Sequence, residues 1–131
     1  MAPRFFADET DLGLGKALAL AHDGVVHPGH SELPEVPRGT VDDEWLPVVG
    51  QQRLVVITRD QKIRRRPVEK RAWVTHGVRG FVLTGRTSQS TTDSLAILER
   101  HWQRIEALVD AEPDGPWMRA VTMSGIRSIN L

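Results

Sequence analysis

The chain of 131 residues contains no cysteine. Disulfide bonds, thiolate zinc sites and cysteine nucleophiles are therefore excluded, and the composition fits a reducing compartment. No apolar run approaches the roughly 20 residues that a membrane-spanning helix needs. The first residues, up to Asp8, also lack the apolar core of a signal peptide. We therefore expect a soluble, cytoplasmic protein with no membrane partner.

The chain also lacks a net charge, because seventeen Lys and Arg residues balance seventeen Asp and Glu residues. Attraction of the whole molecule to nucleic acid is therefore absent, and any RNA binding must come from a local patch. The basic residues that form such a patch are Arg59, Lys62, Arg64, Arg65 and Arg66. A run of this kind is by default a solvated surface, and RNA contact is the functional alternative.

Several common catalytic motifs are missing. The glycines near Lys16 lack the spacing of a phosphate-binding loop, and the histidines show no metal-binding spacing. Ser88 and Ser90 lie in a loop or helix cap with no recognisable base to activate a nucleophile. There is no internal repeat and no low-complexity segment. The remaining candidates for chemistry are carboxylates.

The most informative stretch runs from Leu54 to Arg66. Four consecutive apolar residues, three of them β-branched, predict a strand buried on both faces in the middle of a parallel sheet. The strand ends in Thr58-Arg59-Asp60 and is followed by dense positive charge. This arrangement is typical of a sheet edge that binds a metal and a polyanion.

The rest of the chain alternates between strand and helix patterns. We predict further strands over residues 4–7, 24–27 and 78–84, and a final strand over 117–123 for which an antiparallel edge position is one option. We predict helices over 12–22, 43–50, 67–76 and 91–111. The helix over 43–50 should hold Pro47 in its first turn. These patterns predict one domain over residues 1–131, of the α/β class, with three layers and a mostly parallel central sheet.

Carboxylates follow or open three of these elements. Asp8 and Asp60 end strands, and Asp42 or Asp43 opens the middle helix. In a parallel sheet these positions share one edge, where a divalent cation would offset the repulsion between the carboxylates. Oxygen ligands of this kind suit magnesium or manganese. Taken singly, each residue is also an ordinary turn or helix-cap aspartate.

The ordered set of motifs resembles the PIN-like domain superfamily, in particular the short branch related to VapC-type toxin ribonucleases. The matching segments are Phe6-Ala7-Asp8-Glu9, Asp42-Asp43-Glu44-Trp45-Leu46 and Val56-Ile57-Thr58-Arg59-Asp60, and later Pro67-Val68-Glu69-Lys70-Arg71-Ala72-Trp73 and His76-Gly77. Each motif is short, but their order matches along roughly the first half of the chain, and the later segments extend the resemblance over most of it.

The resemblance implies a three-layer α/β/α PIN-like fold and assigns roles to single residues. Asp8, Asp42 and Asp60 would be the catalytic metal ligands, and Thr58 would orient them. Glu9 and Asp43 are further candidate ligands. Thr10 stands where the family often has asparagine. A fourth acidic residue, usual in longer PIN nucleases, has no clear counterpart here, and Asp93 and Asp110 are candidates by composition alone.

The resemblance also implies an activity and partners. We expect an endoribonuclease that depends on magnesium or manganese, the toxin of a toxin–antitoxin pair, with a cognate antitoxin and a homodimer as partners. One alternative is a receiver-like phosphoacceptor domain, although residues 119–124 lack the lysine that this class needs after its last strand. The other is a catalytically silent nucleic-acid-binding domain in which the carboxylates only cap helices.

Overall fold

The computed structural model describes residues 2–85 and 90–131 and contains a six-stranded sheet. The strand order is β2-β1-β3-β4-β5-β6, and every pair is parallel except β5 with β6. The strands are β1 (Phe5–Ala7), β2 (Val25–Val26), β3 (Val55–Thr58), β4 (Arg79–Leu83), β5 (Trp117–Thr122) and β6 (Gly125–Ile129). The helices are a 3-10 turn η1 (Glu9–Asp11), α1 (Leu12–Ala21), α2 (Asp42–Gln51), α3 (Pro67–Thr75) and α4 (Thr91–Ala111).

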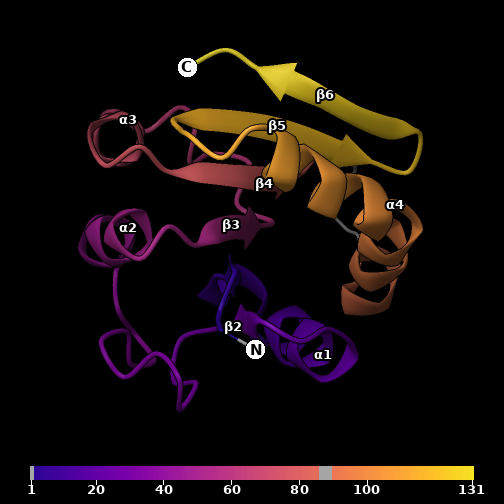
Figure 1. Cartoon of the computed structure of the whole chain (residues 1–131), viewed down its shortest axis with the longest axis horizontal. Helices are drawn as coiled ribbons and strands as arrows, with labels where there is room; N and C mark the ends of the chain where they lie inside the picture. The colour runs from indigo at the N-terminus through magenta and orange to yellow at the C-terminus, as the bar shows by residue number, and fades with distance from the viewer. Residues whose placement is uncertain (1, 86–89) are drawn as a thin grey trace.

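Helices cover both faces of the sheet, with α1 and α4 on one side and α2 and α3 on the other (Figure 1). Successive strand residues point to opposite faces, so Phe5 packs with α1 and α4 while Phe6 packs with α2. The predicted α/β class and the three-layer, mostly parallel architecture are confirmed. Within residues 2–85 and 90–131, no helix is long and apolar enough to cross a membrane.

The C-terminal part of the sheet differs from the prediction. The strand over 117–122 is parallel to β4, and the antiparallel edge is formed by β6, which the sequence patterns did not predict. β6 is weakly marked because it is an edge strand whose residues are mostly exposed or half-buried, so it lacks a continuous apolar run. A tight connection at Met123 and Ser124 joins it to β5.

Two helices differ in detail. Pro47 is the sixth residue of α2, which begins at Asp42, and so it lies in the second turn and not in the first. The spacing of Leu14, Leu18 and Ala21 places them on one face of α1 and predicts that they are buried. Leu14 and Leu18 are buried, whereas Ala21 is exposed at the end of the helix. Gly15 is buried instead, and a Cβ there would lie 3.4 Å from the Cβ of Ala7, so the glycine allows α1 to approach β1 closely.

The topology brings the ends of β1 and β3 together. These strands are neighbours although about fifty residues separate them, with Ala7 paired with Ile57. The chain passes from β1 to β2 on one side and then crosses back to β3 on the other side of β1, so the order of the strands reverses at this point. Ligands bind at such a crossing point in open α/β sheets, beyond the carboxyl ends of the strands. The loop over residues 28–40 leads from β2 to the start of α2, and it is held by the fully buried side chains of Leu33 and Val36.

Candidate functional site

Asp8 lies directly after β1 at the carboxyl edge of the sheet, with 4% of its surface exposed. Its Oδ2 accepts hydrogen bonds from the hydroxyls of Thr58 at 2.7 Å and Thr10 at 3.0 Å. Its backbone N–H donates to Ile57 O. The carboxylate is therefore held in one orientation between the ends of β1 and β3.

Asp60 follows β3 and is fixed by its own turn. Its backbone N–H donates to Thr58 Oγ1 at 2.9 Å, and its Oδ1 accepts from the backbone N–H of Lys62 at 3.0 Å. Thr58 thus contacts both aspartates, donating to Asp8 and accepting from Asp60. Thr58 therefore lies where it could orient both carboxylates, and this role stays a prediction.

Asp42 begins α2 and is half-buried, while Asp43 beside it is exposed. The indole N–H of Trp45 donates to Asp42 Oδ1 at 3.0 Å, and the Trp45 ring packs on Phe6 in the core. The residue that faces the site is therefore Asp42. The sequence left this choice open because both residues occupy the first turn of the same helix.

The three carboxylates influence one another electrostatically. Burial raises the pKa of Asp8 from 3.8 to about 7, and the charges of Asp42 and Asp60 add to this increase. Burial also raises the pKa of Asp42, again with a contribution from Asp60. The structure therefore brings together Asp8, Asp42 and Asp60, the set predicted from sequence, and their mutual repulsion favours a cation among them.

Arg66, at the N-terminus of α3, supplies such a positive charge. Its Nη1 lies 2.7 Å from Asp60 Oδ2 and 3.5 Å from Asp42 Oδ2, and its Nη2 lies 3.3 Å from Asp60 Oδ1. The hydrogen bond with Asp60 is the main reason that the pKa of Arg66 is raised. RNA contact by this residue stays a prediction, and in the structure its guanidinium lies between two of the carboxylates.

The position of Arg66 leads to a testable expectation about metal affinity. Arg66→Gln should raise the affinity for Mn²⁺ by up to about fivefold, because the cation no longer competes with an ion pair worth up to about 1 kcal/mol at a partly exposed site. Calorimetric titration with Mn²⁺ measures the change. Arg71→Gln, which removes an exposed arginine from the same helix, is the matched control. Equal affinities in the two variants would contradict the competition.

The other basic residues fall into two groups. Arg59 Nη1 donates to Asp11 Oδ2 at 2.6 Å, and Asp11 also accepts from Leu14 N, so Arg59 links the end of β3 to the start of α1.

The second group lies in the segment between β3 and α3, which the fully buried side chain of Ile63 anchors. In this segment Lys62 and Arg65 are exposed, and Arg64 is half-buried. Within residues 2–85 and 90–131 these three make no ion pair. We call Lys62, Arg64 and Arg65 the basic turn.

The remaining acidic candidates have other contacts. Glu9 Oε1 accepts from the backbone N–H of Gly39 at 2.6 Å and so ties the 28–40 loop to the start of η1. Asp93 forms a capping box with Ser90 at the start of α4. Asp110 lies near the opposite end of α4 and pairs with Arg4 at 2.8 Å, at the amino edge of the sheet. Ser90 is thus a cap, as predicted, whereas Ser88 lies outside the described residues.

Glu69 is an acidic neighbour of the site that sequence reasoning missed. Its charge raises the pKa of Asp42 and that of Arg66. The signal was present in the sequence, because Glu69 follows Arg66 by three residues across the start of a helix, where such pairs face one another. Thr10, which donates to Asp8, was noted only as a departure from the family pattern.

The donor set has the chemistry of a magnesium or manganese site, since it consists of carboxylate oxygens around a buried aspartate that a cation would stabilise. The carboxylates are, however, too far apart to form a metal site without rearrangement. Within residues 2–85 and 90–131, no three His, Cys, Asp or Glu side chains stand close enough together to hold a metal ion as they are placed. Arg66 provides the physical reason, because Asp60 and Asp42 are turned toward its guanidinium.

An open parallel sheet with carboxylates at the crossing point of its strands defines a class of α/β domains whose chemistry takes place at the carboxyl edge. A family model described as PIN like domain matches residues 3–85. The chain therefore belongs to the PIN-like domain family, as the motifs indicated, and not to the receiver class. No curated protein and no solved structure matches the chain. PIN-like domains are generally nucleases that use divalent metals, so membership indicates a nuclease-type, hydrolytic function.

Proposed function

We propose that this protein is a metal-dependent endoribonuclease that hydrolyses RNA phosphodiester bonds with Mg²⁺ or Mn²⁺. The observation that supports this most strongly is the meeting of Asp8, Asp42 and Asp60 from three distant segments at one sheet edge. These residues would hold the cation, with Glu69 close to Asp42. A bound cation supplies charge neutralisation for the phosphodiester and activation of a water nucleophile.

The other residues of the site position the ligands and the RNA. Thr58 and Thr10 orient Asp8 through their hydroxyls, and the Trp45 indole orients Asp42. The basic turn follows Asp60 directly, so Lys62 and Arg65 are exposed beside the carboxylates, where they would bind the phosphate backbone. Asp43 and Glu9 take no direct part in this proposal, because the first is exposed and the second holds the 28–40 loop.

The direct test is cleavage of a fluorescently labelled single-stranded RNA by the purified chain. We expect cleavage with Mn²⁺ or Mg²⁺, none with excess EDTA, and recovery when the metal is restored. A calorimetric titration with Mn²⁺ measures binding independently of activity. If the protein binds no Mn²⁺ and cleaves no RNA under any of these conditions, the proposal is wrong.

A catalytically silent nucleic-acid-binding domain is the second candidate, and one observation favours it. The Arg66 guanidinium already neutralises Asp60 and Asp42, which leaves the carboxylates with a structural partner. In this case RNA would bind the basic turn equally well with Mn²⁺ or EDTA and would remain intact. Binding by fluorescence anisotropy, measured beside cleavage, separates the two candidates.

We further propose that the protein acts as the toxin of a toxin–antitoxin pair, which its resemblance to VapC-type toxin ribonucleases supports. A cognate antitoxin would cover the acidic edge, and a homodimer would extend the basic surface next to it. An adjacent reading frame for a small protein that binds this chain and suppresses its RNA cleavage would support this role. The absence of such a neighbour would contradict the toxin role and leave the nuclease proposal untouched.

A further inference from the structure

Three arginines gather at the amino edge of the sheet, opposite the acidic site. Arg4 precedes β1, Arg53 lies in the turn between α2 and β3, and Arg79 begins β4. All three line an open cavity of about 280 Å³, together with Pro3, Val55, Val109, Pro113 and one carboxylate, Asp110, which pairs with Arg4 at 2.8 Å. The nuclease proposal makes no use of this cavity.

Arg79 is the central member of this cluster, and its side chain is buried, with 8% of the residue exposed. Its Nη2 donates to Arg53 O at 2.7 Å, and no carboxylate in the described part of the chain lies within ion-pair distance of it. Burial lowers its pKa, and the charges of Arg53 and Arg4 lower it further. A guanidinium has five donors, so most of the hydrogen-bonding capacity of this buried cation is left for a ligand.

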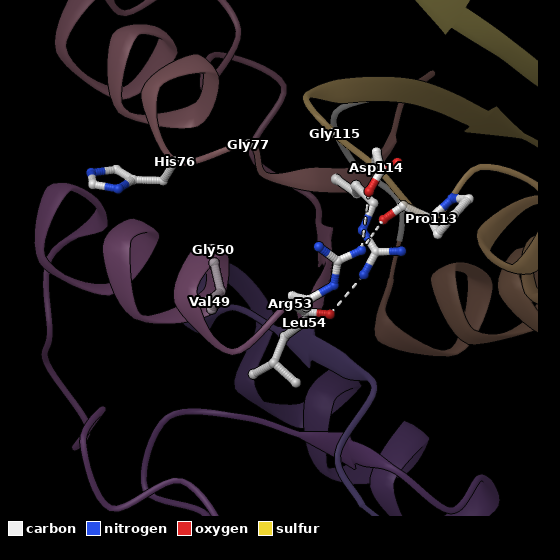
Figure 2. A pocket seen from close by; sticks show the side chains of 10 residues that line it. Val49, Gly50, Arg53, Leu54, His76, Gly77, Pro113, Asp114 and Gly115 are labelled. Carbon is white, nitrogen blue, oxygen red and sulfur yellow. Dashed lines mark hydrogen bonds and ion pairs between the residues drawn. The ribbon is translucent and has the colours of Figure 1, made fainter.

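Arg53 is held beside it by a specific backbone geometry. Its φ of 57° is uncommon for a residue other than glycine, and its Nη2 donates to Pro113 O at 2.6 Å and lies 3.4 Å from Asp114 Oδ1. Figure 2 shows the Arg53 side chain reaching toward Pro113 and Asp114 across a second cavity of about 150 Å³, which shares Arg53, Arg79 and Pro113 with the first.

The walls of this region are closely packed backbone. A Cβ on Gly115 would lie 2.2 Å from Gly77 O, and one on Gly50 would lie 2.5 Å from His76 O. The loops that carry the arginines are therefore held against one another at fixed positions. The acidic partners of Arg4 and Arg53, by contrast, are at the surface. The side chains of Asp110 and Asp114 are 73% and 88% exposed, and that of Glu106, which lies 3.7 Å from Arg4, is 43% exposed. Ion pairs with such exposed groups are weak.

We propose that the cavity between Arg4, Arg53 and Arg79 binds a small phosphate-bearing anion. Guanidinium groups match the geometry and charge of phosphate oxygens. Three positive charges bind a phosphate dianion more strongly than a ligand with a single carboxylate. In the described part of the chain Arg79 feels the charge of Asp114 but forms no ion pair, and the anion would supply one. It would displace the exposed carboxylates that pair with Arg4 and Arg53. The cavity, at about 280 Å³, is slightly smaller than the usual small-molecule pocket of roughly 300–1,000 Å³, and this favours a phosphomonoester over a polymer.

The test is calorimetric titration of the metal-free protein, in EDTA, with inorganic phosphate and in a second arm with a nucleoside 5′-monophosphate. We expect saturable binding of one anion per chain in both arms. Arg4→Gln and Arg53→Asn should weaken it at least about tenfold, since each removes a charged hydrogen-bond donor. Asparagine is chosen at position 53 because it tolerates a positive φ.

Two variants serve as matched controls. Arg104→Gln removes an exposed arginine of α4 that does not line the cavity, and Arg65→Gln removes one from the basic turn. Both should bind phosphate as the unaltered chain does. Arg79→Gln should abolish binding, and circular dichroism establishes whether it folds. Whether or not Arg79→Gln folds, the variants Arg4→Gln and Arg53→Asn show whether the anion binds in this cavity.

Three results would overturn the proposal. The first is no saturable binding of phosphate at roughly 10 mM. The second is binding that survives Arg53→Asn and Arg4→Gln but is lost in Arg65→Gln, which would place the anion on the basic turn. The third is binding of an RNA oligonucleotide without binding of either small anion. None of these results depends on RNA cleavage, so the inference is tested separately from the nuclease proposal.

Discussion

Asp60→Asn should lower Mn²⁺-dependent RNA cleavage by about 10³-fold and weaken Mn²⁺ binding with it. The amide keeps the size of the side chain but removes the charge that a divalent cation needs. Metal catalysis contributes several kcal/mol to stabilisation of the transition state, and each 1.36 kcal/mol corresponds to a factor of ten in rate. The measurement is single-turnover cleavage of labelled RNA, with Mn²⁺ affinity determined by calorimetry.

The matched control is Asp43→Asn, which makes the same chemical change at the exposed neighbour of Asp42. It should retain cleavage within about threefold, because the charge removed is solvated. Since Asp60→Asn also deprives Arg66 of its main partner, the double variant Asp60→Asn/Arg66→Gln separates the two effects and should be as inactive as the single one. Full cleavage by Asp60→Asn would refute the assignment of Asp60 to the metal site.

The metal-free protein should lose stability as the pH rises from about 4 to about 7, through Asp8. Burial raises the pKa of this carboxyl from 3.8 to about 7. In this range the folded chain keeps a proton that the unfolded chain has released, so the free energy of unfolding falls with increasing pH. The shift corresponds to about 4 kcal/mol, and the loss is complete above the pKa of the folded state.

Asp8→Asn isolates this contribution, because an asparagine oxygen can still accept the hydrogen bonds from Thr58 and Thr10. The difference in unfolding free energy between the variant and the unaltered chain should grow in favour of the variant by about 4 kcal/mol from pH 4 to pH 8 in EDTA. Comparison of the two chains cancels the opposite effect of Asp11, whose pKa is lowered by hydrogen bonds from Leu14, Thr91 and Arg59 despite its burial.

Urea denaturation at a series of pH values gives the two curves. Addition of Mn²⁺ at pH 8 should reduce the advantage of the variant, because a bound cation stabilises the ionised Asp8. A difference that stays constant from pH 4 to pH 8 would show that Asp8 titrates normally, and it would remove the electrostatic argument for a cation at this edge.

Much of the architecture could be read from local sequence. The apolar run before Asp60 predicted β3. The long helix is predicted by apolar residues at spacings of three and four, which are Leu95, Leu98, Trp102, Ile105 and Val109. The last four are buried in α4, and Leu95 is half-buried. These features are local, because burial selects apolar residues at the period of each element. β6 could not be predicted in this way, because an edge strand needs no apolar run and its pairing with β5 depends on a neighbour.

In the candidate site, too, some features follow from local sequence and others depend on tertiary packing. That Asp8 and Asp60 share an edge follows from each ending a strand of one parallel sheet, which sequence patterns predict. That Asp42 and not Asp43 faces the site depends on how α2 packs, since Trp45 is buried on Phe6 and donates to Asp42. The rotation of a helix on a sheet is set by such contacts across the core, and neighbouring residues in one turn do not reveal it.

The sequence by itself determined the α/β class, the order of the strands and helices as far as β5, and the three carboxylates that lie at the carboxyl edge of the sheet. Only the tertiary structure decided that Arg66 lies between Asp42 and Asp60, that Arg59 pairs with Asp11, and that Arg4, Arg53 and Arg79 meet at the opposite edge. The physical reason is that ionic contacts depend on distances in space. Those distances are set by strands that are neighbours in the sheet while their residues lie far apart in the chain.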